Sequence, residues 1–252
     1  MTNRHPSFSH PMIQEALCEV HFRREDDAGW NPSLFGEVFK ALERDYPTLE
    51  PASEVGLQLK IGAEGIGQGV LPPRQLMRYR HRSRNLLVQL RDGVLTVNVL
   101  AEYPGWAQMR ADVLDAWGRA AKPLAPASIL RVGLRYINMI PRLNADETAA
   151  TWLKESAYVP SGALGSLPGF LSRVEARLSQ TERLVVTVGD GPAVEGQPAS
   201  IVFDIDRIDE RELGPTTDAL TACIEGLHDS VWQVFESSLT DRLRSLLERA
   251  DR

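Results

Sequence analysis

One hairpin constrains the fold of this chain more than any other feature of its sequence. The stretch NLLVQLRDGVLTVNVL, residues 85–100, contains two runs of alternating apolar and polar residues joined by Asp92-Gly93. An Asp-Gly pair between two such runs is favoured in the two-residue type I′ turns of β-hairpins. Strands of this pattern bury one face only, so we expect an antiparallel sheet that is covered by a layer of helices.

Similar alternation elsewhere predicts the remaining strands. They are expected at 15–24, 54–62, 70–79, 129–140, 172–179, 183–188 and 200–206. Helices are expected after Asn31-Pro32 as far as Pro47, after the YPGW loop as far as Pro123, briefly near 146–156, and over 216–249. The glycine-rich run GAEGIGQG, 62–69, is interpreted as a flexible loop between strands, because no helix that could cradle a phosphate follows it.

The order of these elements predicts an α+β fold built from two similar halves. A flexible arm, 1–12, precedes a first β-α-β4-α half, 13–123, and a second β-α-β3-α half, 124–252, that ends in a long C-terminal helix. The boundary falls near KPLAPAS, 122–128, and the repeated order suggests internal duplication. This order resembles that of TATA-binding-type and helix-grip domains, which is an analogy of fold and not of function.

Composition indicates an ordinary globular chain. The net charge is −6, and no apolar run approaches the roughly 18 residues of a membrane-spanning helix, so we expect no membrane insertion. The polar N-terminus, MTNRHPSFSHPM, lacks the apolar segment of a signal peptide. Cys18 and Cys223 belong to no metal or redox motif and are predicted to be buried thiols, which suggests a cytoplasmic protein.

An arginine stripe, RYRHRSR at 78–84, is the main candidate for a docking surface. Seven arginines are predicted to contribute: Arg74, Arg78, Arg80, Arg82, Arg84, Arg91 and Arg135. Such a cluster binds phosphate or carboxylate groups well. Three interpretations stay open, namely a charged strand that protects a sheet edge, a site for an anionic protein, and a site for nucleic acid. The acidic net charge counts against the third.

Aromatic and amide side chains form a second candidate site. Tyr103 and Trp106 bracket the Pro-Gly turn of YPGW, and Tyr136 and Asn138 belong to the RYIN segment. These four residues are suited either to stacking on a planar ligand and hydrogen bonding with it, or to filling corners of the core.

The sequence predicts no catalytic residue, no metal site and no cofactor. The five histidines, His5, His10, His21, His81 and His228, show no metal-binding spacing, and there is no GxSxG motif. The acidic segment DIDRIDE, 204–210, offers Asp204 and Asp206 on one side of a strand, and we interpret that side as a solvated face. These observations weigh against an enzyme without deciding the question.

Five segments resemble one uncharacterised, sporadically distributed family of bacterial proteins of about this length. They are PMIQEALCEVHF, LLVQLRDGVLTVNVLAEYPGW, ILRVGLRYINMI, IVFDID and GLHDSVWQVFESSLTDRLRSLL. The resemblance implies a soluble bacterial protein of patchy inheritance, as is common among accessory genes of mobile elements and phage-defence loci.

The first functional hypothesis is a non-enzymatic binding or accessory protein that docks a macromolecular partner, a protein above all, in a bacterial defence or toxin-neutralising module. The alternative is a protein that binds a small ligand or nucleic acid through the concave face of the sheet and the Arg78–Arg84 stripe. An unrecognised enzyme ranks third.

Overall fold

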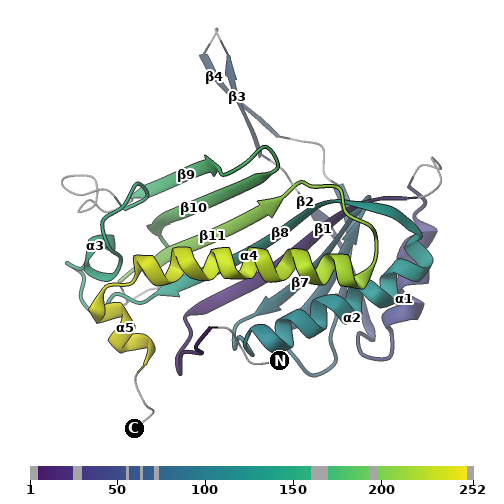
Figure 1. The fold of residues 1–252 in the computed structure, drawn as a ribbon, viewed down its shortest axis with the longest axis horizontal. Coiled ribbons are helices and arrows are strands. Elements are labelled where there is room, and N and C mark those ends of the chain that lie inside the picture. Colours follow the sequence, from purple (N-terminus) through teal and green to yellow (C-terminus); the bar gives the residue numbers. More distant parts are fainter. Residues whose placement is uncertain are drawn as a thin grey trace.

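The fold centres on one large antiparallel sheet (Figure 1). The structure is a computed structural model that describes residues 5–24, 30–54, 57–62, 65–70, 74–159, 170–192 and 198–248. Its strands are β1 (Ile13–Arg24), β2 (Thr48–Glu54), β3 (Leu57–Gly62), β4 (Gly65–Val70), β5 (Arg74–Arg80), β6 (Leu86–Arg91), β7 (Val94–Leu100), β8 (Pro126–Ile140), β9 (Leu171–Arg177), β10 (Glu182–Asp190) and β11 (Ile201–Asp209). Nine of them form the sheet in the order β2-β5-β6-β7-β1-β8-β11-β10-β9, and β3 pairs with β4 in a separate hairpin.

Helices cover one face of this sheet. They are α1 (Ser33–Leu42), α2 (Trp106–Leu124), α3 (Ala149–Trp152), α4 (Thr217–Ser238) and α5 (Asp241–Leu247). Helix α4 runs across β8 and β11, while α2 packs on β7 and lies between α1 and α4 (Figure 1). The α+β class and the antiparallel sheet predicted from the sequence are confirmed. Within the described residues, no helix combines the length and the apolar character that crossing a bilayer requires.

Strand β1 shows how the sequence pattern sets the two faces of the sheet. Its buried residues Ala16, Cys18, Val20 and Phe22 belong to the hydrophobic core beneath the helices. Glu19 lies on the opposite side, where no described helix covers the sheet; we call this side the open face. A strand with side chains alternating in this way needs only one covering layer.

The predicted hairpin forms as β6 and β7, with Arg91 opposite Val94. Its turn is not type I′, because Gly93 has a positive φ of 67° while Asp92 is not among the residues with positive φ. A type I′ turn needs positive φ at both central residues. The Asp-Gly pair therefore predicted the position of the turn and its glycine, but not the turn type.

The predicted strand at 54–62 and the glycine-rich loop at 62–69 were wrong in detail. The main sheet takes Thr48–Glu54 as β2, an edge strand where Pro51 is tolerated because its missing N–H can face away from the sheet. The glycine-rich run supplies β4, which pairs with β3 from Leu57 opposite Val70. Strand pairing uses backbone groups, so a run of glycines can form a strand when a partner segment lies beside it.

Two predicted helix ends were also wrong. Helix α2 continues through Pro123 and stops at Ala125, which has a left-handed φ of 44° and donates its N–H to the Ala121 carbonyl. The predicted single C-terminal helix is broken, because Leu239 is extended and Thr240 begins α5 by accepting a hydrogen bond from the Leu243 N–H (3.3 Å). Leu239 is buried at this break and forms an isolated bridge with Leu153, so an extended residue separates the two helices.

Residues 5–12 of the predicted flexible arm pack against the C-terminal helices. The His10 N–H donates to the Leu247 carbonyl (3.0 Å), and the Met139 N–H donates to the Met12 carbonyl (2.8 Å). The Phe8 ring stacks on Trp232 of α4, with 5.7 Å between ring centroids. The arm thereby roofs a space between α4 and the sheet.

Candidate functional site

A cavity of about 290 Å³ lies between the arm, the start of α2 and the middle of α4. Its floor includes residues of β8 and β11. Ring side chains dominate the lining, and those that matter below are Phe8, Tyr103, Trp106, Tyr136, His228 and Trp232. The volume is close to the lower end of the range for small-molecule sites, about 300–1,000 Å³, and the apolar lining is typical of them.

The structure brings the four predicted aromatic and amide residues together in this cavity. Tyr103, Trp106, Tyr136 and Asn138 all line it. The Tyr103 and Tyr136 hydroxyls are 2.9 Å apart, and the Asn138 Nδ2 donates to the Phe203 carbonyl (3.0 Å). Tyr136 and Asn138 are buried parts of the core, as the second interpretation expects, and they also border the cavity. Burial also raises the pKa of Tyr136 well above its ordinary value, which keeps its hydroxyl neutral.

A sharp turn at Gly105 places Trp106 at the cavity. Gly105 has a φ of 94°, which L side chains rarely adopt, and α2 begins at the next residue. The Trp106 indole N–H donates to Glu225 of α4 (3.3 Å), and Glu225 also accepts from Arg110 (2.7 Å). These contacts fix the ring between α2 and α4.

His228 of α4 lies flat on Trp106, with ring centroids 4.0 Å apart and planes inclined by 5°. Burial, reinforced by the neighbouring His5, lowers the pKa of His228 to about 4, although Asp229 opposes the shift. The His228 imidazole is therefore neutral at pH 7 and offers one nitrogen donor and one acceptor.

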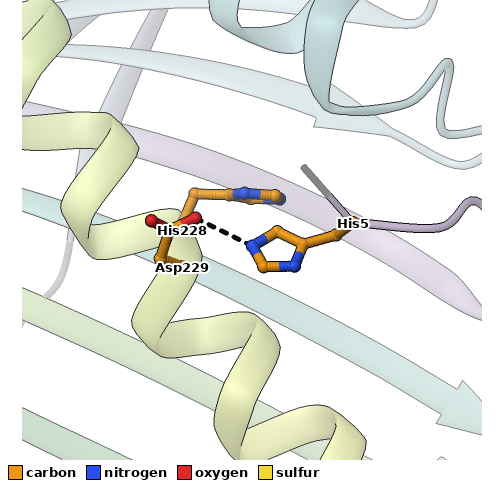
Figure 2. Close-up of side chains that lie close together, drawn as sticks. All are labelled: His5, His228 and Asp229. Atoms are coloured by element: carbon orange, nitrogen blue, oxygen red, sulfur yellow. Dashed lines mark hydrogen bonds and ion pairs between the residues drawn. The ribbon is translucent and has the colours of Figure 1, made fainter. Parts of the chain in front are cut away.

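His5 lines one end of the cavity and contacts Asp229 of α4. His5 comes from the arm, and its Nε2 lies 2.8 Å from the Asp229 Oδ1 (Figure 2). The His5 ring also stacks on Trp232, with centroids 5.0 Å apart. Sequence reasoning missed these residues, because His5 and Asp229 are separated by 224 positions. The only local signal was that His228 and Trp232 are four residues apart on one side of a predicted helix.

The predicted arginine stripe does not form one uncommitted cationic surface. Arg78 and Arg80 lie on β5, while Arg82 and Arg84 lie in the loop that follows. Arg84 donates two hydrogen bonds to Asp112 of α2 (2.8 and 2.9 Å), and Arg80 pairs with Glu50 (3.2 Å). Arg78 donates to the amide oxygen of Gln89 (3.2 Å), and Arg82 is exposed.

Of the other three arginines of the set, Arg135 lies apart from the stripe. Arg135 belongs to β8, four strand spacings or about 19 Å from β5 across the sheet, and it pairs with Asp204. The Arg91 Nη2 lies 3.7 Å from the Oε2 of Glu19, which is on the open face. Arg74 begins β5, and its side chain lies outside the described residues.

The acidic segment DIDRIDE, 204–210, does not form the solvated strand face that the sequence predicts, because most of its residues are buried. Asp204 is buried and bonded to Arg135. Burial raises the pKa of Asp206 to about 6, and the charges of Asp204 and Glu19 add to the shift while Arg135 and Arg131 oppose it. The sequence interpretation was wrong here because long side chains from neighbouring strands shield these carboxylates from water.

Both cysteines are buried and outside any disulfide, as predicted. Comparison with known proteins yields neither a matching family model nor a matching curated protein. The function of the chain must therefore be inferred from its own geometry.

Proposed function

We propose that this protein binds a small planar molecule in the cavity between the arm, α2 and α4. The observation that supports this best is the convergence of Tyr103, Trp106, Tyr136 and Asn138, which come from two distant segments, on one space roofed by the arm. Concave, mostly apolar spaces with a few polar groups are the usual form of a small-molecule site.

The lining indicates the chemistry of the ligand. The flat faces of Trp106 and Trp232 favour a planar, largely apolar ring system. The Tyr103 hydroxyl and the neutral His228 ring supply a few hydrogen-bonding groups beside those faces. The ligand class that fits is an uncharged heteroaromatic compound of modest size.

The test is ligand-observed NMR with a set of planar heteroaromatic fragments such as indole, quinoline and purine. Trp232→Ala is expected to remove the saturation-transfer signal of fragments that bind wild-type protein, because Trp232 is a half-buried wall of the cavity. Trp30→Ala is the matched control, since Trp30 is also half-buried but packs on Phe35 of α1, outside the cavity. Equal binding to the wild type and to Trp232→Ala, or no binding by the wild type, would reject the proposal.

Docking of a protein partner is the second candidate function, and one observation favours it. Strand β9 forms one edge of the sheet, and Leu171 at its start is 73% exposed. An exposed edge strand with apolar side chains can accept a strand from another chain. Native mass spectrometry of the tagged protein purified from its host would detect such a partner, and a Leu171→Lys variant should then lose it.

Five broader expectations are part of this proposal. Internal duplication is supported by the strand order, in which β1-β7-β6-β5 on one side of the sheet centre matches β8-β11-β10-β9 on the other. The likeness to TATA-binding-type or helix-grip folds, the link to bacterial defence and the cytoplasmic location rest on the sequence patterns alone. The same holds for membership of the sporadically distributed family.

A further inference from the structure

We propose that His5, His228 and Asp229 form a binding site for a divalent transition-metal ion, with Zn²⁺ as the best-fitting ion. Each residue offers one ligand atom, and all three ligand atoms lie within 4.8 Å of one another. Among the described residues, no other set of three histidine, cysteine or acidic side chains meets this criterion. Figure 2 shows the two imidazoles and the carboxylate lying close together, with His5 bonded to Asp229.

The spacing suits coordination after small side-chain movements. A tetrahedral ion with bonds of about 2.0–2.1 Å holds its ligand atoms about 3.3 Å apart. The His5 Nε2 and the Asp229 Oδ1 are 2.8 Å apart, and no two ligand atoms of the set are more than 4.8 Å apart. Ion binding would lengthen the first distance to about 3.3 Å and bring any wider separation close to the same value.

The ligand atoms suit a metal ion of intermediate softness. Two imidazole nitrogens and one carboxylate oxygen match Zn²⁺ and other late divalent ions better than they match Mg²⁺ or Ca²⁺, which prefer oxygen ligands. Both imidazoles are held by ring contacts, His228 on Trp106 and His5 on Trp232. Rings oriented in this way lose little freedom when they bind an ion.

The position of the site links it to the cavity. His5 and His228 line the cavity, so an ion held by the three protein ligands would lie at its edge. Three-ligand zinc sites with an open position bind water or an external ligand there. His5 belongs to the arm and Asp229 to α4, so the ion would also fasten the roof of the cavity to its wall. The inference does not depend on the proposed heteroaromatic ligand.

Calorimetric titration of metal-free full-length protein with Zn²⁺ alone tests the site. We expect one ion per chain with micromolar or tighter affinity, weakened at least about tenfold in His5→Ala and in Asp229→Asn. His10→Ala is the matched control, because His10 is on the same arm but outside the cluster, and its affinity should equal that of the wild type. Thermal melting of each variant verifies its folding.

Co²⁺ substitution gives a second readout that needs no variant. A nitrogen-and-oxygen site of low coordination number should produce visible d–d absorption when Co²⁺ is added, and Zn²⁺ should remove it. The absence of saturable Zn²⁺ binding by the wild type, or unchanged affinity in His5→Ala or Asp229→Asn, would overturn the proposal.

Discussion

Arg135 and Asp204 join the neighbouring strands β8 and β11 through a pair of parallel hydrogen bonds. The Arg135 Nε donates to Asp204 Oδ1 (2.8 Å), and Nη2 donates to Oδ2 (2.7 Å). The carboxylate is 8% exposed, whereas the guanidinium side chain is 39% exposed. The arginine thus shields a carboxylate that would otherwise be buried without a counter-charge.

Replacing Arg135 with Leu should therefore destabilise the protein. The loss leaves the buried Asp204 carboxylate without its two donors, which costs on the order of 2 kcal/mol in the free energy of unfolding. The double variant Arg135→Leu, Asp204→Leu should recover most of that loss, because neither charge then remains. Urea denaturation of the two variants measures both effects, and a double variant less stable than Arg135→Leu would contradict this account.

Asp206 should make stability fall as the pH rises. Its pKa in the folded protein is about 6, above the ordinary value of 3.8, mainly because it is buried. A carboxyl group with a raised pKa favours the folded state fully below the ordinary pKa, and that contribution is lost as the pH rises through about 6. Asp206→Asn should match the wild type near pH 4 and exceed it by on the order of 2 kcal/mol at pH 8.

Glu19 serves as a control, because its pKa is shifted in the opposite direction from that of Asp206. Burial raises its pKa, but the hydrogen bond with His21 and the charges of His21, Arg131 and Arg91 outweigh burial and bring the pKa to about 2. Its contribution is present above pH 4.5 and is lost as the pH falls toward 2. Glu19→Gln should therefore lose stability at neutral pH, and thermal melts from pH 3 to 8 would show the two trends diverging. Parallel trends would refute the assignment for Asp206.

The arginines of the 78–84 stripe should differ in their effects on stability. Arg82 is exposed, so Arg82→Ser should change the free energy of unfolding by no more than about 0.5 kcal/mol. Arg84 is bonded to Asp112, whose side chain is 7% exposed, so Arg84→Ser should cost about 1–2 kcal/mol. Chemical denaturation of the two single variants is the measurement. Equal effects would mean that the Arg84–Asp112 contact contributes nothing in solution.

Both cysteines should be chemically inert in the folded protein. Burial raises the pKa of the Cys18 thiol far above its ordinary range and that of Cys223 to about 12. Reaction with a thiol reagent requires the thiolate, so we expect no labelling by Ellman's reagent at pH 8 until denaturant is added, and then two thiols per chain. Rapid labelling of the native protein would contradict the burial of these side chains.

Removal of all residues after Gly226 should prevent folding. The deleted segment carries the buried Leu227, Val231, Leu239, Leu243 and Leu247. Each buried side chain of this kind contributes roughly 1.5–3 kcal/mol, and their sum is comparable with the whole stability of a typical domain. Insoluble or unfolded protein by circular dichroism is the expected result. A truncated chain that melts cooperatively would show that these residues serve a partner instead.

Local pattern was sufficient to predict most of the sheet. The alternation in β1 and the Asp92-Gly93 turn each depend on neighbouring residues only, and the corresponding strands lie where the sequence placed them. The break at Leu239 could not be predicted in this way. Leu239 continues the apolar spacing of α4, and only its bridge to Leu153, far away in the sequence, accounts for its extended backbone.

The candidate site depends even more on contacts between residues that are far apart in the sequence. Tyr103, Trp106, Tyr136 and Asn138 were singled out for their chemistry, yet nothing in the sequence indicated that they share one cavity. The grouping of His5 with Asp229 depends on how the arm packs, which no local spacing encodes. For the same reason, the sequence could not indicate that Arg84 pairs with Asp112 and Arg135 with Asp204.

The place of β1 and β8 at the centre of the sheet has a consequence for synthesis of the chain. Their pairing joins Ile13 to Asn138, so β1 keeps one edge unpaired until β8, more than a hundred residues later, has been translated. An unpaired strand edge flanked by apolar residues is prone to associate with other nascent chains. We therefore expect slow translation between α2 and β8 to favour aggregation over folding.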